Sequence, residues 1–562
     1  MDLSSSTRIR LQNRPLKFER LEYRKLLAAD LVIKWNDVML AAIREERTAP
    51  PIAARAMAIV QTAIYDSVNA IDRTHAAYAV DVLASPTTSR EAAVSAAAHD
   101  TLVGLFPERQ KARFDAQYQA DKVAIPNGQP FNLGDALGKE VAAKMLALRA
   151  NDGATAVVTY IPGTKPGDWI STLPGNAPAL LPQWPDVTPF AMKSGSQFTP
   201  HGIPALNSKE YADALNEVKA IGSVTSSTRT ADQTNIALFW GNGGGTATPP
   251  GHLNIMAQKA AIAEGNTLSE NARLFAELNV ALADAAIMAW DAKYDTNFWR
   301  PITAIRAAET DGNANTAKDA NWTPLIATPP FPSYVSGHSS FSGAAAAVLK
   351  SFFGFDKFKF TLPCETSGVP DRTFKSFSQA AQESTDSRMF GGIHFRFDNE
   401  DGLTAGGKLG EYVAANFFKH RDHGPAAALV GNILVVIGSD SSDFLTMSQG
   451  QGKFTVKSFG QSLGAVNMGD VKSIVISARS GNDIVELGNE INVSATIFGG
   501  NGNDLLIGGR TNDSIFGEDG HDILFGMLGD DLLDGGDGDD ILYGGPGEDI
   551  LLGRRGRNLL FQ

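Results

Sequence analysis

The sequence predicts an all-α helical bundle followed by a C-terminal all-β region that contains a parallel β-roll. Apolar residues, many of them alanines, recur at helical spacing between residues 30 and 420. The composition changes at 421–428, and from Gly499 the chain repeats every nine residues. We therefore expect a multidomain chain with an N-terminal arm (1–29), a helical domain (30–420), a short-strand β region (421–478) and a β-roll (479–562).

The helical periodicity and the turn-forming residues together predict the individual elements. Helices are expected at 35–75 with an interruption at Pro50-Pro51, and at 90–105, 133–150, 207–222, 231–240, 254–265, 268–290, 338–353, 372–390 and 402–418. Residues 160–206 are rich in proline, glycine and serine, which predicts a long irregular segment. Short strands are expected at 432–436, 454–459 and 473–478.

Composition excludes several classes of protein. The chain has 562 residues, of which 43% are hydrophobic, so it can bury a large core. Its single cysteine, Cys364, rules out an intramolecular disulfide or a cysteine-built metal site. We find no apolar run long enough for a transmembrane segment. The formal charge of −13 argues against nucleic acid as a partner, and residues 499–562 carry most of it, with 13 acidic and 4 basic side chains.

The nine-residue copies combine turn glycines, aspartates and an inward apolar position. The aspartates are Asp504, Asp513, Asp522, Asp531, Asp540 and Asp549. Glycines permit tight turns, and aspartates with turn carbonyls offer hard oxygen ligands suited to Ca²⁺. A disordered Gly/Asp-rich tail is the alternative, which the strict spacing disfavours. The pattern resembles the nonapeptide repeat of calcium-binding RTX proteins, so Ca²⁺ is an expected cofactor.

Two segments of the helical domain carry candidate anion-binding groups. Lys293 and Arg300 are seven residues apart, which on one helix would leave them about 20° apart on the same face, with Trp290 on a neighbouring stripe. Ser336-Gly337-His338 precedes an Ala-rich helix. Ser336 is a candidate N-cap, and the free N–H groups at a helix start form an anion site with His338 at its edge.

A third segment adds a second imidazole. Arg388 is expected to end a helix that begins near Arg372, and Gly391 is a natural residue for the C′ position of its C-terminal cap. The glycines that follow Arg388 would bring His394 back toward it. Asp398, four residues after His394, could then accept a hydrogen bond from the imidazole and fix its tautomer.

Together these segments supply two arginines, a lysine, a serine, a helix N-terminus and two histidines. That set suits a tetrahedral oxyanion such as phosphate or vanadate, because arginine forks and a lysine bind its oxygens while the imidazoles attack, coordinate or exchange a proton. The glycine-rich run 241–245 lacks the Gly-Lys-Ser/Thr of a phosphate loop and is expected to be an entrance loop.

The pattern Lys-x₆-Arg-Pro, Ser-Gly-His and Ser-Arg-x₅-His-x₃-Asp resembles the signature of vanadium-dependent haloperoxidases and type 2 phosphatidic acid phosphatases. It is present as Lys293…Arg300-Pro301, Ser336-Gly337-His338 and Ser387-Arg388…His394…Asp398. Val335 departs from it, since the family usually has proline there. The similarity extends over about residues 30–420 and implies a haloperoxidase-like helical fold.

The resemblance implies roles for these residues. His394 would be the axial vanadium ligand and His338 the acid–base group. The equatorial oxygens of vanadate would be held by Lys293, Arg300, Arg388, the Ser336 hydroxyl and the Gly337 N–H. Trp290 and Phe331 match positions on the halide side. Family enzymes oxidise a halide with hydrogen peroxide and halogenate a small organic acceptor.

Two other functions remain open at this point. The same residues would serve an acid phosphatase in which His394 attacks phosphorus and His338 protonates the leaving alcohol. A protein of another class would be catalytically silent and use its calcium-binding repeats for surface attachment or adhesion. Because RTX proteins commonly leave bacteria without an N-terminal signal, we expect a secreted or cell-surface bacterial protein.

Overall fold

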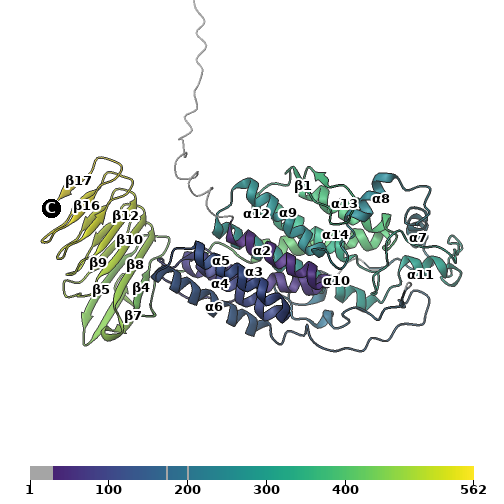
Figure 1. Cartoon of the computed structure of the whole chain (residues 1–562), viewed down its shortest axis with the longest axis horizontal. Coiled ribbons are helices and arrows are strands. Elements are labelled where there is room, and N and C mark those ends of the chain that lie inside the picture. The colour runs from purple at the N-terminus through teal and green to yellow at the C-terminus, as the bar shows by residue number, and fades with distance from the viewer. Residues whose placement is uncertain (1–29, 173–174, 199–201) are drawn as a thin grey trace, which may run out of the picture.

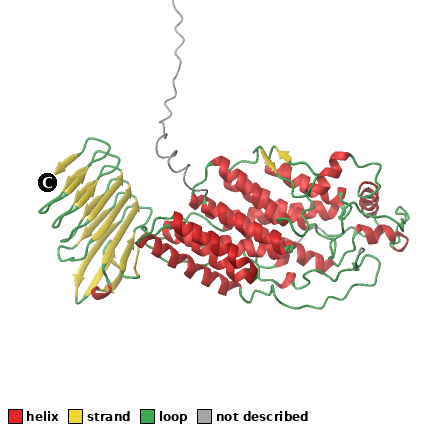
Figure 2. Cartoon of the chain, viewed as in Figure 1, coloured by secondary structure: helices red, strands yellow, loops and turns green. Residues whose placement is uncertain are grey.

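The computed structural model describes residues 30–172, 175–198 and 202–562. The expected N-terminal arm at 1–29 lies outside the described residues. The molecule is elongated, with helices gathered at one end and strands stacked at the other (Figures 1 and 2). This arrangement confirms the predicted fold class, an all-α bundle followed by a C-terminal all-β region with a parallel roll.

Thirteen α-helices form the described helical part. They are α2 (Leu31–Glu46), α3 (Pro50–Asp72), α4 (Arg90–Leu105), α5 (Lys111–Ala124), α6 (Gln129–Arg149), α7 (Lys209–Ile221), α8 (Ala231–Phe239), α9 (Thr248–Glu264), α10 (Leu268–Thr296), α11 (Pro301–Arg306), α12 (Gly337–Phe353), α13 (Phe377–Phe390) and α14 (Arg396–Asn416). Among these residues no helix is both long and apolar enough to cross a membrane.

Helix α10 is the centre of the helical core. Thr267 and Glu270 form a capping box at its start, and nearly every residue from Asn271 to Trp290 is buried. It packs against α3 and α12, and α12 packs closely along α14. That approach depends on glycine, because a Cβ at Gly406 would overlap the Ser340 carbonyl and one at Gly343 the Leu403 carbonyl. The start of α12 and the start of α14 are thereby held side by side.

The structure corrects several expected boundaries. Residues 372–374, expected to begin a helix, form strand β2 (Arg372–Phe374), which pairs antiparallel with β1 (Phe360–Leu362). Helix α13 begins only at Phe377, where Ser376 accepts a hydrogen bond from the Gln379 N–H. Helices α5 and α11 were not anticipated, and α9 and α14 each begin six residues earlier than expected.

The remaining strands build two larger sheets. Their bounds are β3 (Ala426–Val430), β4 (Ile433–Ile437), β5 (Phe444–Gly450), β6 (Lys453–Ser458), β7 (Gln461–Asn467), β8 (Ser473–Ser480), β9 (Ile484–Leu487), β10 (Ala495–Asn501), β11 (Leu505–Ile507), β12 (Ser514–Asp519), β13 (Ile523–Phe525), β14 (Leu532–Asp534), β15 (Ile541–Tyr543), β16 (Ile550–Leu552) and β17 (Leu559–Phe561). One sheet has the order β16-β14-β12-β10-β8-β4-β3 and the other β17-β15-β13-β11-β9-β5-β6-β7.

From β10 onward successive copies alternate between the two sheets. Residues 18 apart therefore pair in parallel, as Leu506 does with Leu524 and Leu524 with Leu542. The inward residues Leu506, Ile515, Leu524, Leu533 and Leu542 are fully buried between the sheets, whereas Leu560 in the last copy is exposed. Strands β4 and β5 pair in parallel with β8 and β9, so both sheets run without a break through residues 421–478. The expected β region and the expected roll therefore form one two-sheet body, residues 426–561, and from here on "the β-roll" means this whole body.

Candidate active site

The candidate residues come from five helices or helix starts that meet at one place. Lys293 lies in the last turn of α10, and Arg300 is the residue before α11. His338 is at the start of α12, and Arg388 is near the end of α13. His394 and Asp398 bracket the start of α14.

His394 occupies the centre of this cluster. Its Nδ1 lies 2.9 Å from Oδ2 of Asp398, and its Nε2 lies 3.0 Å from Nη1 of Arg300. The carboxylate accepts and the guanidinium donates, so the hydrogen bonds assign the proton to Nδ1 and leave the lone pair on Nε2. Ser333 also donates its hydroxyl to Asp398. The imidazole is therefore oriented with a basic nitrogen directed toward a cation.

Lys293 holds the loop that leads into α12 through hydrogen bonds. Its Nζ donates to the carbonyls of Pro332 and Ser333 at 3.1 and 2.8 Å, and to that of Val335. Ser336 follows directly and caps α12, with its side chain accepting from the Ser339 N–H. The predicted N-cap is thus present, and the lysine holds the residues immediately before it.

His338 and Arg388 share one acceptor. The carbonyl oxygen of Trp240 lies 3.0 Å from His338 Nε2 and 2.7 Å from Arg388 Nη2. The carbonyl only accepts, so His338 carries its proton on Nε2 and its lone pair on Nδ1. Sequence reasoning missed Trp240, and no side-chain motif could have revealed it because the contact is made by the backbone.

Burial dominates the electrostatics of the cluster. Lys293, Arg300 and Arg388 are each almost completely buried, and Asp398 is the carboxylate among them. Loss of solvent lowers the pKa of Arg300 and of Arg388 to about 9, so both remain charged at neutral pH. Burial, together with the neighbouring cations, holds the pKa of His338 and of His394 well below its usual range, so both imidazoles are neutral.

These charges leave the cluster with an excess of positive charge. Two buried guanidinium groups face one carboxylate together with Lys293, whose pKa is held well below its usual range by burial and by Arg300, and Nη2 of Arg300 is buried without a hydrogen-bond partner in the described chain. An unsatisfied buried guanidinium N–H costs free energy unless an acceptor completes it. The cluster therefore fits a bound oxyanion, and vanadate or phosphate would satisfy it equally well.

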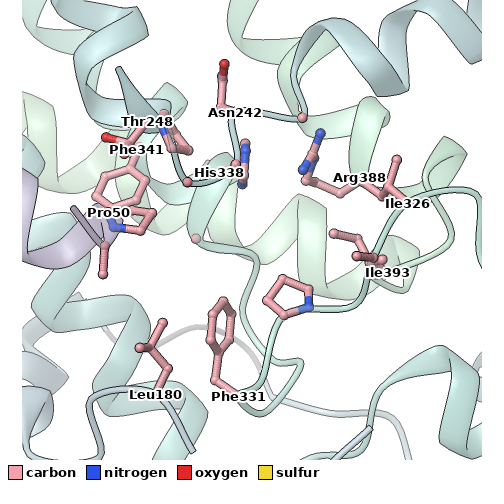
Figure 3. A pocket seen from close by; sticks show the side chains of 18 of the residues that line it. Pro50, Leu180, Asn242, Thr248, Ile326, Phe331, His338, Phe341, Arg388 and Ile393 are labelled. Carbon is pink, nitrogen blue, oxygen red and sulfur yellow. The ribbon is translucent and has the colours of Figure 1, made fainter. Parts of the chain in front are cut away.

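A cavity of about 570 Å³ opens onto this cluster. His338, Arg388 and His394 line it on one side, and Trp290 and Phe331, whose rings are 4.9 Å apart, line it as well. Figure 3 shows His338 and Arg388 across the cavity from Phe331 and Leu180. The cavity lining also includes Gly337 and the glycine-rich segment 241–244.

Two local expectations were wrong. Lys293 and Arg300 do not share a helix face, since α10 ends at Thr296 and Asn297 turns the chain in a left-handed conformation. Arg300 reaches the cluster from the next helix start instead. Gly391 is right-handed at φ −75°, and it is Gly392, at φ 78°, that turns the chain toward His394.

The predicted calcium residues form two ladders in the β-roll. Oδ1 of each aspartate accepts the backbone N–H of the residue one coil earlier, at 2.8 Å for Asp522 and the Asp504 N–H. One ladder contains Asp443, Asp483, Asp504, Asp522 and Asp540, and the other contains Asp513, Asp531 and Asp549. Asp443 was missed, although it occupies the aspartate position of a degenerate copy that begins at Gly438.

The second carboxylate oxygens in these ladders fit a cation. Oδ2 of Asp504, Asp522, Asp531, Asp540 and Asp549 is buried without a hydrogen-bond partner. Burial raises the pKa of Asp522 to about 7 and that of Asp531 to about 6, as expected for carboxylates that lack a counter-charge. Among the described residues no group of three or more acidic, histidine or cysteine side chains is placed to hold a metal ion, so an ion here would also need backbone carbonyls as ligands.

Comparisons with known proteins agree with this architecture. Residues 273–423 match the family described as the VCPO second helical-bundle domain, and residues 498–533 and 525–560 match the RTX calcium-binding nonapeptide repeat. A vanadium chloroperoxidase of Curvularia inaequalis is 26% identical over 424 residues, which span 60% of this chain and 68% of that protein.

Two solved structures resemble the chain. A bacterial vanadium-dependent iodoperoxidase is 29% identical, with a TM-score of 0.62, over 70% of this chain and 97% of its own. A bacterial vanadium-dependent chloroperoxidase in its holo form shares the fold at 16% identity, with a TM-score of 0.54, over 65% of this chain and 91% of its own. These matches confirm the resemblance inferred from the motifs: residues 273–423 match the model of the vanadium chloroperoxidase second helical-bundle domain, and the C-terminal copies match the RTX calcium-binding repeat.

Proposed function

We propose that this chain is a vanadate-dependent haloperoxidase, which oxidises a halide with hydrogen peroxide and halogenates a small organic acceptor. The observation that carries the proposal is the lone-pair Nε2 of His394 beside Arg300, among buried cations at one side of an apolar cavity. The relatives named above are a chloroperoxidase and an iodoperoxidase, which supports an enzyme of this superfamily.

Each residue has a role in this proposal. His394 ligates vanadium through Nε2, and Asp398 and Ser333 hold its imidazole in place. Vanadate oxygens would be held by Arg300, Arg388, Ser336 and the Gly337 N–H, and Lys293, whose N–H groups donate to three backbone carbonyls, would act on them through its charge. When bound, vanadate supplies a Lewis-acidic V(V) centre that activates hydrogen peroxide toward a halide. Trp290 and Phe331 give the halide an apolar surface.

His338 is the acid–base residue of the proposal. Its Nε2–H is bound to the Trp240 carbonyl, so Nδ1 is the atom that takes a proton from peroxide and returns it to the departing oxygen. The low pKa of this imidazole keeps it neutral at pH 7, so its Nδ1 lone pair is free to accept a proton. The overall reaction is X⁻ + H₂O₂ + H⁺ → HOX + H₂O, followed by HOX + R–H → R–X + H₂O.

We further propose that the β-roll binds Ca²⁺ and that the protein is secreted or held at the cell surface. The unpartnered Oδ2 atoms of the aspartate ladders support calcium binding. The matched repeats are of a class that binds calcium and is typical of secreted bacterial proteins.

A paired assay tests the enzyme function. Bromination of monochlorodimedone with vanadate and peroxide is compared with hydrolysis of an aryl phosphate in the absence of vanadate. We expect bromination, lost in His394→Ala and retained in His420→Ala, a change at a histidine outside the cluster whose side chain is 67% exposed. We expect His338→Ala to lose turnover but to keep most of its vanadate affinity. Phosphate hydrolysis without bromination would identify a phosphatase. The absence of both activities would identify a catalytically silent binding protein.

A further inference from the structure

The cavity is larger than its proposed inorganic reactants require. At about 30 Å³ per water-sized group, the four oxygens of vanadate fill roughly 120 Å³. The cavity measures about 570 Å³. The remaining space lies within the range of about 300 to 1,000 Å³ that is usual for sites that enclose a small organic molecule.

The walls of this extra space are apolar. Leu180, Ile326, Phe331 and Phe341 line it, and Pro329 and Pro330 add rigid surface. Figure 3 shows Leu180 and Phe331 on the side opposite His338 and Arg388. Such walls favour a ring-bearing apolar molecule, because burying it removes apolar surface from water on both sides.

One lining residue is an exposed cation. Arg47 follows the last turn of α2 at φ 51°, and its guanidinium lies over Gly244 and Gly245, where a Cβ would come within 3.5 and 3.2 Å of Nη2 and Nη1. The glycines leave room for it. This guanidinium has neither an ion pair nor a hydrogen bond to any residue that the structure describes.

The acidic side chains near Arg47 in the sequence are already paired. Glu45 pairs with Arg113, and Glu46 pairs with Arg109. Glu365, which approaches the same loop, pairs with Arg44 and accepts the Ala247 N–H at 2.9 Å. The charge of Arg47 therefore remains available to an anion that enters the cavity.

We propose that the cavity binds the organic acceptor itself, as a planar apolar molecule with an anionic substituent. Arg47 holds the anionic group, and the ring lies against Phe331 and Leu180 with its reactive carbon toward His338 and Arg388. Halogenation then occurs inside the cavity: the ring carbon gains X from HOX and loses a proton, and the hydroxide of HOX leaves as water. This inference rests on the proposed haloperoxidase function, with hydrogen peroxide as the oxidant.

Binding without turnover tests the inference. The full-length protein, in saturating orthovanadate but without peroxide or halide, is titrated calorimetrically with 6-hydroxy-2-naphthoate and with 2-naphthol. The two molecules share a ring system and differ in the carboxylate. Because vanadate occupies the buried cation cluster, the naphthoate carboxylate cannot bind at that cluster during the titration.

Two variants separate the charge from the shape of the cavity. We expect Arg47→Gln to weaken naphthoate about tenfold, the usual effect of one lost charge-assisted hydrogen bond, and to leave 2-naphthol unchanged. Ala327→Trp, which fills the cavity from an exposed position, should weaken both ligands by similar factors. Arg510→Gln removes an exposed arginine of the β-roll and should change neither. Equal affinities of wild type and Arg47→Gln for naphthoate would overturn the role of Arg47, and the absence of any binding would overturn the site.

A competition assay links binding to chemistry. Taurine is a small hydrophilic trap for HOBr, and we expect naphthoate to be brominated in preference to it by wild type but less so by Ala327→Trp. The same product ratio as with added HOBr would show that halogenation occurs in solution and would overturn the inference, while the proposed function would stand. If neither trap is brominated, the proposed function fails, and the titrations still decide whether the cavity binds the ring.

Discussion

The Nδ1 atom of His394 lies 2.9 Å from Oδ2 of Asp398, and that same oxygen accepts the Phe395 N–H at 3.2 Å and the Ser333 hydroxyl. All three donors are buried. The Phe395 N–H and the Ser333 hydroxyl hold the Asp398 carboxylate in place, and the carboxylate in turn orients the His394 imidazole. In the proposed function this pair decides which histidine nitrogen is offered to vanadium.

We therefore predict that Asp398→Ala weakens vanadate binding by about 10- to 100-fold, because the imidazole loses the group that fixes its tautomer. Equilibrium dialysis against orthovanadate measures the affinity directly. Glu400→Ala is the matched control, since Glu400 lies on the same helix but is exposed and pairs with Arg396. An unchanged affinity in Asp398→Ala would separate this carboxylate from vanadate binding.

A second prediction concerns the glycine that opens each copy of the repeat. A Cβ at Gly517 would lie 2.5 Å from the Gly535 carbonyl oxygen and closer still to Oδ2 of Asp522. Gly517→Ala should therefore lower the free energy of unfolding of the β-roll by about 2 kcal/mol or more and weaken its calcium binding. Urea denaturation followed by circular dichroism measures this. Gly450→Ala should be near neutral, because nothing lies within 4 Å of its added Cβ, and equal effects would contradict the steric argument.

Calcium should stabilise the β-roll through the aspartate ladders. Ligand linkage predicts a gain of about 2.7 kcal/mol when free calcium is 100 times the dissociation constant, and a chelator should abolish it. Asp522→Asn removes one of the unpartnered carboxylates and should reduce the calcium-dependent rise in melting temperature. Asp470→Asn changes an exposed aspartate outside the ladders and should keep the full rise. Scanning calorimetry with and without calcium decides between these outcomes.

The burial of Glu277 should make the free energy of unfolding depend on pH. It is 4% exposed in α10, and burial raises its pKa to about 7, opposed by Arg273 at 3.9 Å and by Lys419. The folded state therefore holds a proton that the unfolded state releases above about pH 4.5, so this group's contribution to stability declines from about pH 4.5 to pH 7 and is constant above that.

Glu277→Gln should remove this decline, by up to about 3 kcal/mol between pH 5 and pH 8. Glu277 lines a small cavity together with His75 and His420. The pKa of His75 is lowered to about 4, so its contribution to stability changes with pH in the opposite direction. Only the difference between wild type and variant isolates Glu277. Parallel pH profiles from thermal denaturation would refute the prediction.

Periodicity predicted the architecture well because both kinds of repetition follow directly from covalent geometry. A helix requires a 3.6-residue apolar period, and a roll requires a fixed nine-residue copy, so α10 and the inward leucines were visible in the sequence. Residues 372–374 were assigned wrongly because a three-residue strand is too short to show a period, and its partner β1 lies ten residues upstream.

The candidate site was predictable as a set of residues but not as a geometry. The motifs identified the cations and imidazoles, yet Arg300 reaches His394 only because Asn297 turns the chain after α10. The Trp240 carbonyl, which orients both His338 and Arg388, leaves no trace in the sequence because every residue has a carbonyl. Tertiary contacts made by the backbone can be found only in coordinates.

The 18-residue pairing distance makes the β-roll a modular device. Inserting two further copies would add one coil and lengthen the stack by about 4.8 Å, the spacing between neighbouring strands, without altering any existing pair. Gain or loss of whole copies can therefore tune the number of ions and the reach of the tail in discrete increments, while the helical end is left untouched.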